Sequence, residues 1–262
     1  MPVSDAGAMR EAAEREFTRQ AASFEDARLN TAFTVHLDRL ADFAAPRADD
    51  VCLDSACGTG LVARRLALRA RQVTALDTTP EMLRTGKAAA DAEGIGNVVF
   101  QRGDAARLPF LDDSFSLAVS RFSLHHVASP AAVVAELVRV CRPGGRVVLA
   151  DMVVPDGLTG APDRFERLRD PSHGAMLRVD AIRDLLREAG ADAGPSEVFD
   201  VPRPVRPWLR QAGTPEDTAR RIERILAREL VGGAPTGLRP HSVDGDLWFT
   251  QTWAHIAASP LQ

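Results

Sequence analysis

The residues with the clearest chemical purpose lie at positions 51–60, which read Val-Cys-Leu-Asp-Ser-Ala-Cys-Gly-Thr-Gly. A short apolar run ends in Asp54, and Gly58 and Gly60 precede a helical pattern. Glycine lets a ligand approach the backbone closely, and the N-terminus of a helix presents free N–H groups with a partial positive charge. The segment therefore predicts a strand, a tight turn and a helix, with a nucleoside-like ligand lying across the turn.

The glycines alone do not identify the nucleoside. Gly58-x-Gly60-x-x-Ala63 also satisfies the dinucleotide fingerprint G-x-G-x-x-G/A, with Asp77 at a suitable distance to bind a ribose. A tight strand–helix turn without any ligand is a third interpretation of the same spacing.

Acidic residues at the ends of the next two predicted strands favour an adenosine. A carboxylate at Asp77 can accept hydrogen bonds from both ribose hydroxyls, and Met82 in the following helix can pack on a flat purine. Asp104 and the backbone N–H of Ala105 can pair with the exocyclic amine and a ring nitrogen of adenine. Because ligands bind outside the carboxyl ends of the strands in open α/β sheets, these residues predict one shared site.

The elements that must position these residues follow from the periodicity of apolar side chains. Two amphipathic helices are expected first, with the stripes Ala13, Phe17, Ala21, Phe24 and Phe33, Leu37, Leu40, Ala44. Short apolar runs then alternate with helical segments, which predicts a mainly parallel, doubly wound sheet buried on both faces. The strands expected in this region are Val51–Leu53, Val73–Leu76, Val98–Phe100, Leu117–Ser120 and Val147–Ala150.

The pattern changes after Asp151. Residues 152–176 are rich in loop-forming residues around a short helical piece, and two further helices are expected to begin at Asp180 and at Thr214. Strands are expected over Ser196–Val201 and Leu247–Ile256. A last pair of strands joined by a helical excursion predicts an antiparallel edge on the parallel sheet.

Composition excludes several other classes of function. The chain has 262 residues, a formal charge of −4 and a pI near 5.9, so no electrostatic attraction to nucleic acid or to a membrane surface is expected. Its first residues lack an apolar targeting segment, and a cytoplasmic location is expected. Three cysteines without paired spacing predict neither a disulfide framework nor a metal site. Tyrosine is absent, which excludes a reductase that depends on a tyrosine proton donor.

Five motifs in order resemble those of class I S-adenosylmethionine (SAM)-dependent methyltransferases, of the type grouped with the ubiquinone/menaquinone-biosynthesis methyltransferases (methyltransferase type 11 domain). The resemblance runs from about Phe17 to the end of the chain. Its motifs are Leu53–Gly60 for the glycine turn, 76–83 for the ribose, 103–110 for adenine, and the later blocks 120–126 and 137–146.

The resemblance implies a Rossmann-like, seven-stranded, mostly parallel sheet with an antiparallel last strand. It implies a single domain with an N-terminal helical lid (1–45), a cofactor-binding core (46–151), and a cap with the C-terminal antiparallel strands (152–262). SAM is the implied cofactor, with its amino-acid end at the glycine turn and a lid helix closing over it. The expected cofactor-binding residues are Gln20, Asp54, Ala56, Cys57, Gly58, Gly60, Asp77, Thr78, Met82, Asp104, Ala105, Ser120 and Arg121.

Two residues depart from the pattern of the family. Ala56 stands where many members have glycine, and Phe24 stands where a tyrosine is often found. The first exchange is expected to be tolerated, whereas the second removes any hydroxyl contact of the lid with the cofactor.

Methyl transfer mainly requires alignment of the acceptor, and a base is needed only when the acceptor must lose a proton. His126 is the first candidate for base or for orienting the acceptor, and His173 is the second. If the fourth strand stays extended through His125 and His126, only one of the two faces the cleft. Asp151 could orient a histidine or cap a turn, and Arg121 could contact the cofactor turn or an anionic acceptor group.

The expected acceptor is a small, partly apolar organic molecule that is methylated on oxygen or carbon. An excess of arginine over lysine is typical of a GC-rich bacterial source, where cofactor or secondary-metabolite biosynthesis is expected. A homodimer through the cap helices is possible. Nicotinamide-dependent and nucleic-acid-modifying enzymes are disfavoured, and a SAM-binding protein that transfers no methyl group stays open as the alternative.

Overall fold

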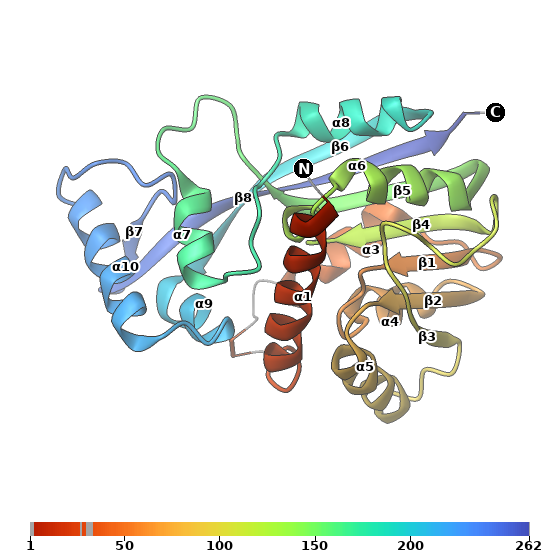
Figure 1. Cartoon of the computed structure of the whole chain (residues 1–262), viewed down its shortest axis with the longest axis horizontal. Helices are drawn as coiled ribbons and strands as arrows, with labels where there is room; N and C mark the ends of the chain where they lie inside the picture. Colours follow the sequence, from red (N-terminus) through yellow and green to blue (C-terminus); the bar gives the residue numbers. More distant parts are fainter. Residues whose placement is uncertain (1–2, 27, 30–33, 262) are drawn as a thin grey trace.

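The computed structural model describes residues 3–26, 28–29 and 34–261. These residues form one twisted sheet of eight strands in the order β3-β2-β1-β4-β5-β8-β6, with β7 paired to β8 beside this path (Figure 1). Strands β1 to β5 pair in parallel, and β8 runs antiparallel to β5, β6 and β7. The strands are β1 (Val51–Ser55), β2 (Gln72–Asp77), β3 (Val98–Arg102), β4 (Phe115–Arg121), β5 (Cys141–Val153), β6 (Ala191–Pro204), β7 (His241–Val243) and β8 (Asp246–Pro260).

Alternating side chains of the central strands build a core on each face of the sheet. Leu53, Ala118 and Leu149 belong to the core that includes α6 and α8, whereas their neighbours Cys52 and Val119 belong to the core that includes α3 and α4. Burial on both faces explains why these strands read as continuous apolar runs. The helices of this part are α3 (Leu37–Ala44), α4 (Leu61–Ala67), α5 (Pro80–Ala92), α6 (Pro130–Val140) and α8 (Val179–Glu188), with the 3₁₀ turn η1 (Leu124–His126) after β4.

A separate apolar cluster holds the cap together. Phe165, Trp208, Leu226 and Phe249 pack in it, and they come from α7 (Pro162–Arg169), α9 (Val205–Gln211), α10 (Glu216–Glu229) and β8. Figure 1 shows the cap at one end of the molecule, beyond the parallel strands. The cap is therefore a second packing unit built on the extended end of β8.

Helix α1 (Val3–Gln20) lies between the cap and the parallel strands in Figure 1. Its contacts reach both sides: Arg19 donates to the backbone oxygen of Ala212 at 2.7 Å, and Glu14 pairs with Arg102 at the end of β3 at 3.0 Å. The helix thus spans the gap between the cap and the carboxyl ends of the strands.

The predicted fold class is confirmed, with two differences in detail. The last pair of strands extends the parallel sheet as predicted, since β8 runs antiparallel to β5 and to the edge strand β6. The sheet has eight strands rather than seven, because the short β7 pairs with the beginning of β8. Helix α9 was not predicted, and Phe33 of the second predicted stripe lies outside the described residues.

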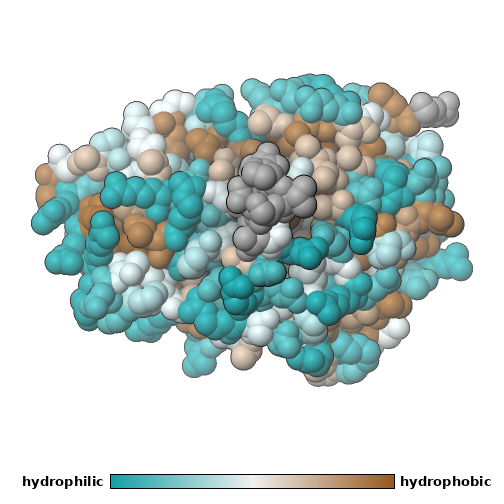
Figure 2. All heavy atoms as spheres, in the orientation of Figure 1, coloured by the Kyte–Doolittle hydropathy of each residue, from teal (hydrophilic) through white to brown (hydrophobic). Residues whose placement is uncertain are grey.

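Hydrophilic side chains predominate on the face shown in Figure 2, with small groups of apolar residues between them. The exposed large apolar residues come from several different elements, such as Leu68 after α4 and Val198 in β6. Within the described part of the chain, none of the helices has both the length and the apolar character needed to cross a membrane.

Candidate active site

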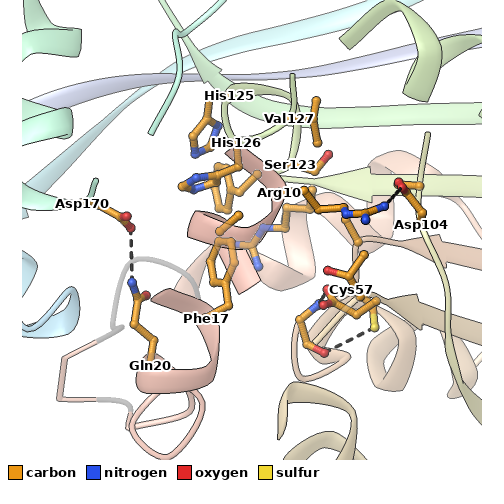
Figure 3. Close-up of a pocket in the computed structure, with 18 of the residues that line it drawn as sticks. Arg10, Phe17, Gln20, Cys57, Asp104, Ser123, His125, His126, Val127 and Asp170 are labelled. Atoms are coloured by element: carbon orange, nitrogen blue, oxygen red, sulfur yellow. Dashed lines mark hydrogen bonds and ion pairs between the residues drawn. The ribbon is translucent and has the colours of Figure 1, made fainter. Parts of the chain in front are cut away.

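A cavity of about 510 Å³ lies where the carboxyl ends of β1, β2, β4 and β5 face α1 and the cap. Its size is typical of pockets for small organic ligands. Asp54, Asp77 and Asp104 line one end, and His125 and His126 line another part of the same cavity. The close-up in Figure 3 shows side chains from α1, the strand ends and the cap converging on this space.

The turn after β1 has the conformation that its glycines predict. Ala56, Gly58 and Gly60 adopt positive φ angles of 54°, 55° and 72°. A side chain at Gly60 would place its Cβ 2.7 Å from the ring of Phe100, and one at Gly58 would extend toward the ring of Phe24 at 3.5 Å. Glycine is therefore required at position 60 by both strain and space.

Two carboxylates fix the turn and face the cavity. Asp54 accepts a hydrogen bond from the N–H of Ala63 at 2.8 Å, and Asp77 accepts from the N–H groups of Gly58 and Thr79, each at 2.9 Å. Burial raises the pKa of Asp54 to about 7, against the opposing effects of the Ala63 N–H and the Arg121 charge. Burial also raises the pKa of Asp77. Two such carboxyl groups gain most from a ligand that brings a positive charge and hydroxyl groups.

The third carboxylate, Asp104, contacts helix α1. Its Oδ1 accepts from the N–H of Ala106 at 2.9 Å, and its Oδ2 lies 3.3 Å from Nη1 of Arg10 on α1 (Figure 3). Helix α1 therefore covers this end of the cavity.

His125 and His126 both line the cavity. They lie in the 3₁₀ turn η1 and not in an extended strand, where neighbouring side chains would point to opposite sides. The Nδ1 atom of His125 lies 2.5 Å from Oδ1 of Asp151, whose carboxylate also accepts from the N–H groups of Leu124 and Met152. Burial lowers the pKa of His125, but the charge and hydrogen bond of Asp151, together with the charges of Glu166 and Asp170, outweigh it, so that the net shift is upward. The arrangement is that of a histidine held in one tautomer by a buried carboxylate.

His126 has the opposite electrostatic environment. Its Nδ1 lies 3.2 Å from the backbone oxygen and 3.1 Å from the hydroxyl oxygen of Ser172. The carbonyl can only accept, and the hydroxyl donates its proton to Asp170, so Nδ1 carries the proton and Nε2 is the acceptor nitrogen. Burial and the charge of His125 lower the pKa of His126 to about 3. Phe17 of α1 packs edge-on against the ring at 5.0 Å. His126 is therefore a neutral hydrogen-bond acceptor near neutral pH.

The comparisons with known proteins agree with this geometry. Residues 53–149 match the model of a family described as a methyltransferase domain. The chain is 35% identical over 217 residues to 27-O-demethylrifamycin SV methyltransferase of Amycolatopsis mediterranei, and the match covers 79% of this chain and 79% of that protein. It is 36% identical over 148 residues to the ubiquinone/menaquinone biosynthesis C-methyltransferase UbiE of Dinoroseobacter shibae, which covers 55% of this chain and 59% of that one.

Among solved structures, the YcgJ protein of Bacillus subtilis is similar with a TM-score of 0.75 and 25% identity, over 86% of this chain and 98% of that one. The chain belongs to the class I SAM-dependent methyltransferases. Its cofactor is SAM, as the resemblance of the five motifs implies.

The donor set of the cavity fits SAM. The buried Asp54 complements a cationic amino group, Asp77 keeps oxygen lone pairs for ribose hydroxyls, and Asp104 with Ala105 offers an acceptor and a donor for adenine. Gly58 leaves open the space between the turn and Phe24. The methyltransferase therefore has a site of suitable polarity at each part of the cofactor.

Most of the site residues predicted from the sequence line this cavity. They are Gln20, Asp54, Ala56, Cys57, Gly58, Asp77, Thr78, Asp104, Ala105, Arg121 and His126. The position of Gln20 is set by the cap, since its Nε2 donates to Oδ2 of Asp170 at 3.2 Å (Figure 3).

Four predicted residues lie outside the cavity lining. Gly60 caps α4, and Met82 is fully buried in α5. The hydroxyl of Ser120 donates to the backbone oxygen of Ser55 at 2.7 Å, so it ties β4 to β1. The ring of His173 lies 5.3 Å from that of His125, but it is outside the cavity lining and pairs through Nε2 with Asp163 at 2.7 Å.

Several polar residues that line the cavity were not predicted as site residues. His125 belongs to the same motif as His126. Asp151, which lies in the neighbouring strand β5, is the residue that could have indicated a role for His125. No local signal marks the charged and amide residues, because they meet only when α1 and the cap pack against the core. Among these further lining residues are Arg10, Arg169, Asp170, Arg203 and Gln211.

Proposed function

We propose that this SAM-dependent methyltransferase transfers its methyl group to oxygen or carbon of a small organic acceptor that enters between α1, the histidine pair and the cap. The observation that carries the proposal is the single cavity lined both by Asp54, Asp77 and Asp104 and by His125 and His126. An acceptor bound at the histidines is then adjacent to a cofactor bound at the carboxylates.

Bound SAM supplies an activated methyl group, so the chain has to hold, align and protect the reactants. Asp54 and the turn from Ala56 to Gly60 would hold the amino-acid end, Asp77 the ribose, and Asp104 with Ala105 the adenine. Positioning of this kind contributes roughly 7–11 kcal/mol to a two-substrate reaction. The half-buried Phe17 and Phe122 would exclude water from the reacting groups.

The two histidines have different proposed roles. Asp151 holds the Nδ1 proton of His125 and raises its pKa, so the outer nitrogen of His125 is suited to accept a proton from a hydroxyl or an acidic carbon. His126 stays neutral and its Nε2 is suited to receive a hydrogen bond that orients the acceptor.

The lid role of residues 1–45, the core role of 46–151 and the cap role of 152–262 are part of the proposal. Support comes from the contacts of α1, since Phe17 packs on His126 and Gln20 reaches Asp170 of the cap. A biosynthetic substrate is supported by the similarity to a rifamycin and to a quinone methyltransferase.

The proposed role of the site is tested by titrating the purified protein with S-adenosylhomocysteine, the demethylated form of the cofactor, in a calorimeter. Saturable binding that Asp77→Asn weakens by about tenfold or more is expected, since each lost charge-assisted hydrogen bond costs roughly 1.5–3 kcal/mol. Binding that Asp77→Asn leaves unchanged would contradict the assignment of the ribose to Asp77.

A further inference from the structure

The cap contributes two buried guanidinium groups to the cavity, and they share one hydrogen-bond acceptor. The Oε1 atom of Gln211 accepts from Nη2 of Arg169 at 3.3 Å and from Nη2 of Arg203 at 3.2 Å. Arg169 is 8% exposed and Arg203 is 3% exposed, and all three residues line the cavity. Two like charges are therefore held close together by a neutral amide.

Further contacts close this arrangement into a ring, and Nε of Arg169 also donates to the backbone oxygen of Trp208 at 3.0 Å. Glu166 pairs with Nη1 of Arg169 at 3.0 Å and accepts from Nε2 of Gln251 at 2.6 Å. The Oε1 of Gln251 in turn accepts from Nη1 of Arg203 at 3.0 Å. The ring thus contains two cations and one carboxylate, and the two amides fix the direction of each guanidinium.

One more arginine and two more carboxylates lie around this end of the cavity. Arg121 at the end of β4 lies near enough to lower the pKa of Arg203, and Asp170 is a further carboxylate on the wall of the cavity at this end. Burial, with the charges of Arg169 and Arg121, lowers the pKa of Arg203 to about 9. Asp54 interacts with Arg121, so three cations face the three carboxylates Asp54, Glu166 and Asp170, and the cofactor brings a further positive charge at its sulfonium.

Apolar side chains adjoin the cationic ring. Met152 and Phe122 line the cavity, and Met152 also contacts Nε2 of Gln251 through its sulfur at 3.1 Å. Phe122 packs edge-on against Trp253, whose indole N–H donates to Oε1 of Gln251 at 3.2 Å. An acceptor that fits this wall combines an apolar body with an acidic group.

We propose that Arg169 and Arg203, with Arg121 beside them, form an anion-binding subsite that selects an acceptor carrying a carboxylate or phosphate on an apolar, ring-like body. The inference rests on the proposed function and deepens it by naming the acceptor class. Guanidinium groups in a fixed fork bind such anions through paired hydrogen bonds, and a bound anion relieves the repulsion between buried cations. The anion also fixes which end of the acceptor faces the histidines.

The test is a binding measurement by fluorine NMR on the enzyme saturated with S-adenosylhomocysteine. The probes are 4-fluorobenzoate, 4-fluorophenyl phosphate and the neutral 4-fluorobenzamide, which has nearly the shape of the benzoate. We expect at least one anion to bind about tenfold or more tightly than the amide, which corresponds to about 1.4 kcal/mol. The tighter of the two anions identifies the acidic group.

Variants locate the effect. Arg203→Gln is expected to reduce the preference for the anion to about threefold or less, and Arg203→Lys to keep part of it, because a lysine retains the charge without the fork. Arg164→Gln is the matched control, since Arg164 is an exposed arginine of the same helix as Arg169. It should leave binding of all three probes unchanged.

Equal binding of anion and amide by the wild-type enzyme, or no saturable anion binding, would overturn the subsite even if the variants failed to fold. An anion preference that survives Arg203→Gln in a folded protein would also overturn it. Failure of S-adenosylhomocysteine to bind in the same samples would instead contradict the proposed cofactor site.

Discussion

The pH dependence of cofactor binding provides a sharp test of the role of Asp54. The side chain is buried, and burial raises its pKa to about 7. The group is therefore about half protonated near neutral pH before any ligand binds. A cationic amino group requires the ionised carboxylate, so binding must displace the proton at lower pH.

The size of the effect follows from this pKa. Each pH unit below the pKa costs about 1.4 kcal/mol, so the Kd of S-adenosylhomocysteine should rise roughly tenfold per unit between about pH 7 and pH 5. Above about pH 7.5 the affinity should be level, until the amino group of the ligand itself loses its proton. Near pH 6 binding should release close to one proton.

The assay is calorimetric titration over this range in two buffers with different ionisation enthalpies, which reports affinity and proton release together. Asp54→Asn keeps the acceptor for the Ala63 N–H, binds the ligand more weakly at pH 8, and should lose most of the pH dependence. Because the pKa of Asp77 is also raised, any slope left in the variant reports on Asp77. A wild-type profile as flat as that of the variant, with no proton released, would refute the assignment.

The remaining predictions concern stability and turnover. The pKa of Asp54 is raised in the folded state, so ionisation of this group destabilises the fold as the pH rises from about 4 through 7. Asp54→Asn should therefore raise the free energy of unfolding at pH 8 by about 2–4 kcal/mol in urea titrations. An unchanged or lower value would contradict a buried charge at this position. His126→Ala should lower kcat about a hundredfold with any acceptor that supports turnover while the Kd of S-adenosylhomocysteine stays the same; unaltered kcat would exclude its orienting role. Asp151→Asn should lower kcat by a similar factor and remove the acidic limb of the pH–rate profile. If the variant loses cofactor binding and keeps the shape of the profile, the Asp151–His125 pair is only structural. Ala56→Gly should raise the free energy of unfolding by about 1 kcal/mol, since Ala56 has a φ of 54°, and a destabilised variant would contradict strain at this position.

The parts of the molecule that the sequence could predict are those encoded by neighbouring residues. The turn at 51–60 contains its own glycines and its own helix start, and Asp77 and Asp104 follow the apolar runs 73–76 and 98–100 closely in the sequence. Since parallel strands end at the same edge of a sheet, local patterns were enough to bring these carboxylates together.

The parts that the sequence could not predict depend on contacts between distant segments. Gln211 bridges Arg169 and Arg203 only because α9 folds back on α7 and β6, and the Val-Arg-Pro start of α9 reads as a loop. For His125, alternation along an extended strand predicts that only one of the two histidines faces the cleft. The 3₁₀ turn removes that alternation and brings Asp151 of β5 to its ring.

His173 lies beside the histidine pair but outside the cavity lining. Its place in a cap loop was compatible with a ring that faces the strand ends, but Asp163 in the first turn of α7 binds Nε2 at 2.7 Å. A single well-placed carboxylate thus decides the direction of the ring.

The central claim is that this cavity transfers a methyl group from SAM to a small acidic acceptor, and incubation of the enzyme with methyl-labelled SAM and a metabolite extract tests it most directly. Mass spectrometry should find the label in a small molecule with a carboxylate or phosphate, and Arg203→Gln should diminish that product more than Arg164→Gln does. Label found only in protein or nucleic acid, or SAM that is bound but never consumed, would contradict the account.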